Sequence, residues 1–127
     1  MAGRGVLILG PSGAGKSALA LRLMALGAGL VADDRVILER QEEAVIADAP
    51  AQIAGLIEAR FVGILNAATA GPTALALVVD LDHDENERLP PKRHKNLLGV
   101  SLPLLHNSAT GHFPAAILQY LKAGRSD

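Results

Sequence analysis

The sequence of 127 residues has no cysteine and no tryptophan, and only two phenylalanines and one tyrosine. Without cysteine, the chain can form neither disulfides nor thiolate-ligated metal sites. Because aromatic residues make up 2% of the chain and hydrophobic residues 50%, the core has to be built from valine, leucine, isoleucine and alanine. The length predicts one domain that is large enough for a hydrophobic core of its own.

The sequence also lacks an excess of either charge and any long apolar run. Its formal net charge is −1, so bulk charge predicts no attraction to nucleic acid or to a membrane surface. No apolar stretch approaches the length of about 20 residues that a membrane-spanning helix needs. The residues before the first motif are too few for a signal peptide. We therefore expect a cytoplasmic protein.

The most informative stretch that is present is Gly-Pro-Ser-Gly-Ala-Gly-Lys-Ser, which follows an apolar run and fits G-x-x-x-x-G-K-[ST]. In such a loop, glycines let several backbone N–H groups point at one anion, and the next helix adds partial positive charge. The lysine can reach the β- and γ-phosphates, and the serine hydroxyl can ligate Mg²⁺. The pattern predicts a phosphate loop made of Gly10, Pro11, Ser12, Gly13, Ala14, Gly15, Lys16 and Ser17.

Hydrophobic periodicity predicts an α/β fold with a mixed sheet and few helices, rather than a regular alternation of strands and helices. In the first helix, Leu19, Leu23 and Leu26 are expected on one face, and Gly27 is expected to end it. Residues 52–57 fit a helix or a strand equally. We expect strands at 4–9, 30–32, 35–40, 44–47, 61–65, 73–81 and 97–105, helices at 16–26 and 113–123, and a surface loop at 82–95.

A phosphate loop needs a carboxylate near its metal ion, and two positions compete for this role. Asp80 ends an apolar run, and the pair Asp33-Asp34 follows another. Adjacent buried carboxylates push their pKa values apart, which suits one metal-facing acid and one general base. Two alternatives remain open: Asp33-Asp34 is a solvated turn, or Asp80 begins an acidic surface loop.

Glu58 and Arg60 alternate with apolar residues, so on a strand they would project from one face. A carboxylate there can hold Mg²⁺, and a guanidinium can grip phosphate. The alternative, an exposed ion pair, is favoured by the residues alone.

Four histidines are scattered through polar segments without metal-site spacing, and we expect them at the surface. Two interpretations of the basic run Lys92–Lys95 stay open: it contacts the substrate protein or a nucleotide phosphate, or it is a solvated surface. The histidines are His83, His94, His106 and His112.

Three motifs, taken together, resemble the C-terminal catalytic domain of the HPr kinase/phosphorylase family. They are GPSGAGKS, LVADDRV and GLIEARFVGIL, in the family's order and close to its spacing. The third is similar to the family's LLEIRGLGII block, and the whole resembles the short form of alpha-proteobacteria. The resemblance implies a single P-loop kinase domain over 1–127, similar in fold to phosphoenolpyruvate carboxykinase. It also implies use of ATP and Mg²⁺, a serine of the phosphocarrier HPr as acceptor, and a hexamer.

The resemblance assigns roles to individual residues. Lys16 would act on the transferring phosphate, and Ser17 and Glu58 would hold Mg²⁺. Asp34 would be the base that activates the substrate serine, which leaves Asp33 as the metal-facing acid of the pair. Two arginines complete the set: Arg60 lies in the third motif, and Arg88 matches the family's catalytic arginine.

The sequence departs from the family in four places. The N-terminal domain of long members is missing, and the family's upstream histidine has no counterpart. Phe61-Val62 replaces Gly-Leu in the third motif. The family's basic loop PVKVGR aligns with Pro103–Ser108, which has no lysine or arginine, and this argues against the reverse, phosphorylase reaction.

Two other functions stay open: a small-molecule P-loop kinase, and a nucleotide-binding sensor that has lost catalysis. The absence of an N-K-x-D motif argues against a GTPase. We also expect self-association, because Phe61, Val62 and the apolar last helix exceed what a small core can bury.

Overall fold

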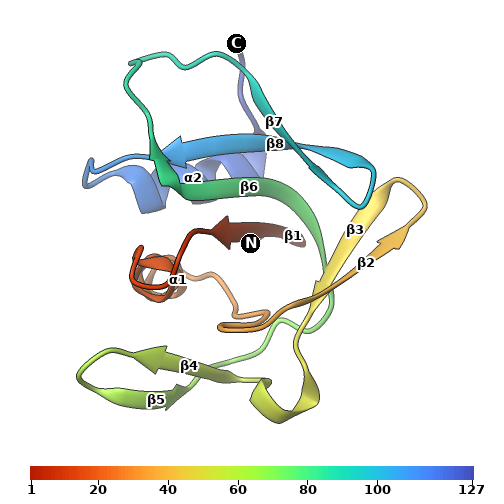
Figure 1. Ribbon diagram of the computed structural model, residues 1–127, viewed down its shortest axis with the longest axis vertical. Helices are drawn as coiled ribbons and strands as arrows, with labels where there is room; N and C mark the ends of the chain where they lie inside the picture. The colour runs from red at the N-terminus through yellow and green to blue at the C-terminus, as the bar shows by residue number, and fades with distance from the viewer.

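The computed structural model describes all residues, 1–127. Figure 1 shows a central sheet with two helices, and a separate two-stranded hairpin at the bottom of the view. The two helices are α1 (Lys16–Ala25) and α2 (Phe113–Ala123), and a 3₁₀ turn covers Ala51–Ile53. The strands are β1 (Arg4–Leu9), β2 (Ile37–Gln41), β3 (Ala44–Asp48), β4 (Leu56–Ala59), β5 (Gly63–Asn66), β6 (Thr73–Asp84), β7 (Arg93–Leu97) and β8 (Val100–Asn107).

The main sheet is mixed, and β6 is its central strand. β1 and β8 run parallel to β6, whereas β3 is antiparallel to its first residues. β2 and β7 extend the sheet as antiparallel partners of β3 and β8. The predicted mixed sheet is therefore confirmed. Because β1, β6 and β8 are parallel, their carboxyl ends meet at one edge, where open α/β sheets bind ligands.

Each face of β6 contributes to a different hydrophobic core. Leu77, Val79 and Leu81 pack with residues of both helices, including Leu19 of α1 and Ile117 of α2. On the other face, Leu75 and Val78 pack with β3 and β8 through Val45, Val100 and Leu102. No aromatic residue is fully buried in either core, as the composition predicts. The helices are thereby fixed against β6, the partner of the strand β1 that leads into the predicted phosphate loop.

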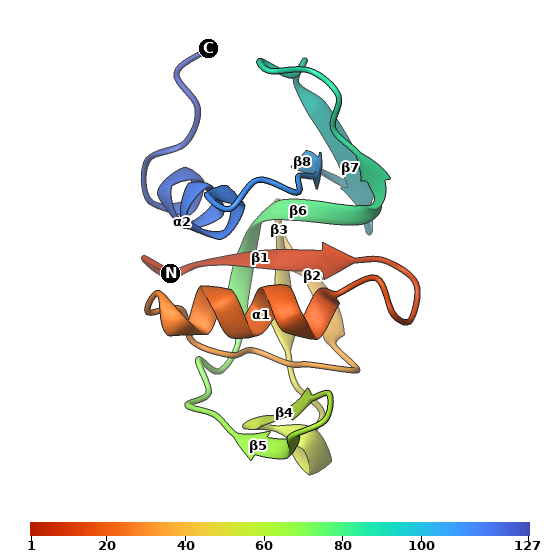
Figure 2. The ribbon, with the colours of Figure 1, turned by 90° about the vertical axis from the view of Figure 1, so that its left-hand side faces the viewer.

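The β4–β5 hairpin stands apart from the main sheet (Figures 1 and 2). Several of its apolar side chains are exposed. The side chain of Phe61 is fully exposed, and those of Val62 and Ile64 are largely so. On β4, the two buried residues are Ile57 and Ala59. In contrast, the large aliphatic residues of α2, Ile117, Leu118 and Leu121, are buried, so the expectation that the last helix adds to an exposed apolar surface is wrong.

Several sequence expectations are corrected by the pairing of strands. Segment 30–32 is not a strand but makes a single bridge, Leu30 to Thr69. Leu26 is half exposed, because α1 ends at Ala25. The expected surface loop at 82–95 is too long, since β6 continues to Asp84 and β7 begins at Arg93. The undecided segment 52–57 divides into the end of a 3₁₀ turn and the start of β4.

The last expected strand, 97–105, is two strands joined by the turn at Leu98 and Gly99. Pro103 does not interrupt β8. The ladder to β6 begins one residue later, at Leu104, so the missing N–H of Pro103 falls just outside that ladder. None of the helices has the length and apolar character needed to cross a membrane.

Candidate active site

The loop between β1 and α1 leaves the carboxyl end of a parallel strand and enters a helix. Gly13 and Gly15 have φ angles of 85° and 96°, a left-handed conformation that glycine adopts without strain. A Cβ on Gly10 would lie 3.1 Å from the Cβ of Ala14 and 3.3 Å from that of Leu81. No side chain caps the start of α1, so its first N–H groups can bind an anion.

Lys16 is the first residue of α1, and its side chain turns back over the loop. The ammonium group donates a hydrogen bond to the carbonyl oxygen of Gly10. The lysine is only partly exposed. Its positive charge therefore sits over the same loop toward which the start of α1 presents its N–H groups.

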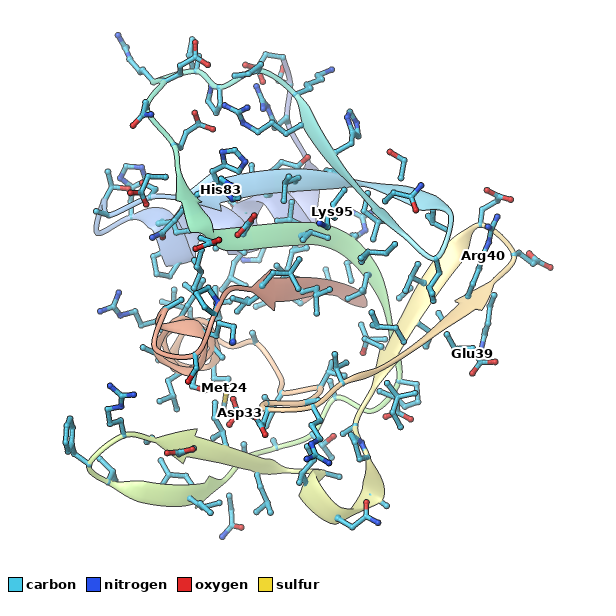
Figure 3. All side chains as sticks on the ribbon, viewed as in Figure 1. Met24, Asp33, Glu39, Arg40, His83 and Lys95 are labelled. Carbon is cyan, nitrogen blue, oxygen red and sulfur yellow. The ribbon has the colours of Figure 1, made fainter.

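Asp33 ties three parts of the chain together beside this loop. Its Oδ1 accepts a hydrogen bond of 2.7 Å from the hydroxyl of Ser17, and its Oδ2 accepts one of 2.9 Å from the backbone N–H of Glu58. Figure 3 shows Asp33 between α1 and the β4–β5 hairpin. One carboxylate thus holds the start of the helix and the separate hairpin at the loop.

Asp34 follows Asp33 in the chain, Glu58 is bonded to Asp33 through its backbone N–H, and both residues are exposed. The side chain of neither residue forms a hydrogen bond or an ion pair within the chain. Asp33 and Asp34 also line a cavity of about 300 Å³, together with Gly10 and Lys16 of the loop. Two unengaged carboxylates are therefore open to a ligand or to an incoming side chain.

Ser17 and Asp33 are in direct contact, and Glu58 is joined to Asp33 through its backbone N–H; all three are residue types that can ligate Mg²⁺ when a phosphate shares the ion. Mg²⁺ usually takes one or two carboxylates, with phosphate oxygens and water completing its shell. No group of three or more histidine, aspartate or glutamate side chains gathers into an all-protein metal cage. The site can thus hold a magnesium ion that arrives with its phosphate ligand.

Asp80, the competing carboxylate, is also beside the loop but in a different setting. It pairs in register with Leu9 of β1 and with His106 of β8. Its Oδ2 lies 2.8 Å from Nδ1 of His83, whose ring stacks on that of His106 at 5.3 Å between centroids. Asp80 is thus engaged, whereas Asp34 is not.

Opposing effects act on the pKa of Asp80. Burial raises it, but hydrogen bonds from the N–H of Asp82 and from His83, with the charges of His83 and His106, bring the pKa below its ordinary value. Sequence reasoning missed this cluster because it treated the histidines as scattered. The cluster depends on the parallel pairing of β6 with β8, which places His106 opposite Asp80 and which no sequence motif indicates.

Comparison with known proteins identifies the family to which this geometry belongs. The family described as the HPr Serine kinase C-terminal domain matches residues 1–106. The chain belongs to this family. It is 44% identical over 115 residues to an HPr kinase/phosphorylase of Azoarcus sp. (strain BH72), a match that covers 80% of this chain and 37% of that protein. It is 40% identical over 116 residues to that of Geobacillus thermodenitrificans (strain NG80-2), which covers 81% of this chain and 38% of that protein.

A solved structure of an HPr kinase domain protein has the same fold. The HPr(Ser) kinase/phosphatase from Coxiella burnetii superposes with a TM-score of 0.78 at 27% identity, covering 94% of this chain and 86% of that one. The chain spans just over a third of the length of the curated HPr kinase/phosphorylases that it matches.

The two arginines expected from the HPr kinase family are not drawn into the cluster around Asp33. β4 ends at Ala59, so Arg60 lies in the turn after it and is exposed. Arg88 is exposed in the loop between β6 and β7, which Figures 1 and 2 both draw on the side of β6 away from α1. Neither arginine forms a hydrogen bond or ion pair within the chain.

The basic run and the remaining histidines lie farther along the chain. Arg93 is held by Glu85, with Nη2 to Oε2 at 3.1 Å, whereas His94 and Lys95 are exposed on β7. This ion pair gives Arg93 a structural partner, so of the basic run it is the residue least free to contact a ligand. His112 is exposed at the start of α2.

Proposed function

We propose that residues 1–127 form a single P-loop kinase domain that transfers the γ-phosphoryl group of ATP to a serine of an HPr-type phosphocarrier protein. The observation that carries this proposal is the hydrogen bond from Ser17 to Asp33 beside the unengaged carboxylate of Asp34. The names of the family members support the acceptor, since the matching proteins are HPr kinase/phosphorylases. We further propose a fold relation to phosphoenolpyruvate carboxykinase.

In the proposed reaction, the serine hydroxyl oxygen forms a bond to the γ-phosphorus of ATP. The bond from that phosphorus to the bridging oxygen breaks, and ADP leaves with the electron pair. The hydroxyl proton passes to the carboxylate of Asp34, which is exposed and therefore accessible to a protein substrate. A general base in this position contributes about 10²–10⁴-fold to the rate.

The other loop residues bind and orient the polyphosphate. The N–H groups of Gly13, Gly15, Lys16 and Ser17 and the ammonium of Lys16 would bind the negative charge that spreads over the phosphate oxygens, whereas the N–H of Ala14 is bonded to the carbonyl oxygen of Pro11. Asp33 orients the Ser17 hydroxyl, and Ser17, Asp33 and Glu58 would hold Mg²⁺. When bound, this ion neutralises charge on the β- and γ-phosphates.

We propose that the two arginines form their contacts when the acceptor binds. Both Arg60 and Arg88 are exposed and without a partner, so each guanidinium is available to a phosphate or to the substrate protein. Arg60 follows Glu58 by two residues, which keeps it near the hairpin held by Asp33. Arg88 would need the loop between β6 and β7 to move toward the site.

We propose that the forward, kinase reaction dominates over phosphorolysis. The segment Pro103–Ser108, which aligns with the basic loop of the family, lies in and just after β8 and contributes His106 but no lysine or arginine. A second phosphate anion therefore has no fixed cation there. We also propose a cytoplasmic homo-oligomer, a hexamer by family, that associates through Phe61, Val62 and Ile64 and has no nucleic-acid or membrane partner.

A label-transfer experiment tests this function. The chain is incubated with Mg²⁺, γ-labelled ATP and purified HPr, and then with small-molecule acceptors in place of HPr. We expect label on a serine of HPr and none when that serine is replaced by alanine. Label on a small molecule would show a metabolite kinase instead, and ATP binding without transfer to any acceptor would show a nucleotide sensor.

A further inference from the structure

The loop between β6 and β7, residues 85–92, is held at its base by an ion pair. Nε and Nη2 of Arg93, the first residue of β7, donate hydrogen bonds of 3.2 and 3.1 Å to the two carboxylate oxygens of Glu85. The N–H of Glu85 donates a hydrogen bond of 2.9 Å to the carbonyl oxygen of Asn107, at the end of β8. The two ends of the loop are therefore fixed to each other and to the main sheet, and residues 86–92 form a flap between them.

One contact from another part of the chain fixes this flap. Arg125, in the tail of residues 124–127 that follows α2, donates a hydrogen bond of 2.8 Å from Nη2 to the carbonyl oxygen of Pro90. No other hydrogen bond joins residues 86–92 to a residue outside the segment 85–93. Every residue of the flap except Pro90 is exposed. The position of the flap therefore depends on Arg125.

The tail holds the guanidinium of Arg125 in a defined orientation. α2 ends at Ala123, and Gly124 turns the chain with a φ of 73°, which glycine adopts without strain. Asp127 binds the same guanidinium, with Nε to Oδ1 at 2.8 Å and Nη2 to Oδ2 at 3.1 Å. The side chain of Arg125 is only 21% exposed. A guanidinium that is bound in this way at two places presents its remaining N–H to the Pro90 carbonyl in one geometry.

The flap carries Arg88, two residues before the residue that the tail holds. Figures 1 and 2 both draw the C-terminus at the same end of the molecule as the flap, with the β4–β5 hairpin at the opposite end. Arg88 is exposed and lies outside the cluster that Asp33 forms with Ser17 and the hairpin. The bond from Arg125 to Pro90 therefore stabilises the position of the flap in which Arg88 is away from the phosphate loop.

We propose that the tail is an inhibitory latch: Arg88 reaches a bound phosphate only when the bond from Arg125 to Pro90 breaks and the flap closes toward the loop Gly10–Ser17. The inference rests on the proposed function, in which Arg88 contacts a phosphate or the acceptor. The closure of such a flap sets the fraction of molecules that is competent for transfer. A hydrogen bond from a charged donor shifts an equilibrium of this kind about tenfold.

Arg125→Ala removes the latch without a change in any helix or strand, because Arg125 follows the last element. Lys122→Ala is the matched control, since it removes a positive charge from the same end of the chain and Lys122 is exposed on α2. The rate of phosphate transfer to HPr should rise about five- to tenfold in Arg125→Ala and stay unchanged in Lys122→Ala. The gain should disappear when Arg88→Ala is combined with Arg125→Ala.

A distance measurement reports the position of the flap without any catalysis. Because the chain has no cysteine, Leu89→Cys on the flap and Ala18→Cys on α1 provide two sites for spin labels, and both residues are exposed. Pulsed electron spin resonance measures the distance between the labels in the absence of nucleotide. The labelled chain should give one distance. Arg125→Ala should add a population with a shorter distance, and Lys122→Ala should not.

The results that would overturn the latch differ from those that would overturn the kinase. If Arg125→Ala leaves both the transfer rate and the distance unchanged, the tail does not hold the flap, and the kinase proposal still stands. If the rate rises without a shorter distance, or rises equally when Arg88 is replaced, the tail does not act through Arg88. If the distance shortens but the rate does not rise, the flap does not limit transfer. If no form of the chain phosphorylates HPr, the proposed function fails and the latch with it.

Discussion

The two sides of the loop Gly10–Ser17 differ in charge and in the elements that build them. One side holds Asp33, Asp34 and Glu58, which come from the segment after α1 and from the β4–β5 hairpin. The other side is a hollow between α1 and the β8–α2 connection that has Arg22 as its only charge. A loop between two such sides can fix the orientation of a ligand whose two ends differ in charge. We propose that the metal and the acceptor bind on the acidic side.

Lys16 serves both sides, and its loss should have the largest effect. Lys16→Ala removes the only ammonium at the loop and should lower phosphate transfer about 10³–10⁵-fold, as for other cations that clamp a transferring phosphate. Binding of ATP and of tripolyphosphate should weaken together. Steady-state transfer rates and calorimetric titration measure both. Lys122→Ala, an exposed lysine on α2, is the control and should change neither.

Asp34→Asn should separate the two sides, because it affects only the acidic one. Transfer to HPr should fall about 10²–10⁴-fold, since the amide cannot accept the serine proton. The Kd of Mg-ATP should remain within about twofold of the wild type. If Asp34→Asn stays active while Asp80→Asn is inactive, Asp80 is the base and our assignment is wrong.

Glu58→Gln tests whether the hairpin supplies a ligand to the metal. The Mg²⁺ concentration for half-maximal activity should rise about tenfold, and the rate should recover at saturating Mg²⁺. Glu39→Gln, on the exposed face of β2, is the matched control and should leave the Mg²⁺ dependence unchanged. An unchanged dependence in Glu58→Gln would remove this residue from the metal site.

The smallest effect concerns the stability of the hairpin that carries Glu58. Phe61 has a φ of 68°, a conformation that strains a residue with a side chain, and its ring is fully exposed. Phe61→Gly should therefore raise the free energy of unfolding by about 0.5–1 kcal/mol, after the entropy that glycine adds to the unfolded chain. Urea unfolding measures it.

The neighbouring residue provides the control for this substitution. Val62 is also largely exposed but is not in the left-handed region, so Val62→Gly should lower the free energy of unfolding. If both substitutions destabilise the chain equally, the backbone at Phe61 is not strained. Phe61→Gly should also reduce self-association, measured by sedimentation, if the hairpin is the contact surface.

The elements with strong apolar patterns were predicted well from the sequence. The strand at 4–9 and the helix at 113–123 have the predicted bounds, and the hairpin of 35–40 with 44–47 differs by one or two residues at its ends. Each has a continuous apolar run or a clear period. Such local patterns predict the structure correctly when the apolar residues of the pattern are also the residues that the fold buries.

The segment 82–95 could not be predicted in the same way. Asp82 and Asp84 extend β6, and His94 and Lys95 lie on the edge strand β7, where charged residues protect an exposed sheet edge. An exposed edge strand and a surface loop are both rich in polar residues, so the composition of the segment does not distinguish them. Only its pairing with β8 shows the difference.

The sequence motifs proposed residues for the candidate site but did not show how these residues are connected. The motifs indicated Ser17, Asp33 and Glu58. Ser17 and Asp33 are 16 residues apart along the chain, and Asp33 and Glu58 are 25 residues apart. That Asp33 binds a hydroxyl on one side and a backbone N–H on the other depends on how distant segments fold. The hollow beside Arg22 and Phe113 has no sequence pattern at all, because it is formed by packing.

A crystal structure of the chain with Mg²⁺ and a non-hydrolysable ATP analogue tests the two-sided loop most directly. The account predicts phosphates on the N–H groups of Gly13, Gly15, Lys16 and Ser17, the ion at Ser17 and Asp33, and the γ-phosphate toward Asp34. Phosphates bound away from this loop, or a nucleoside among the carboxylates, would contradict it.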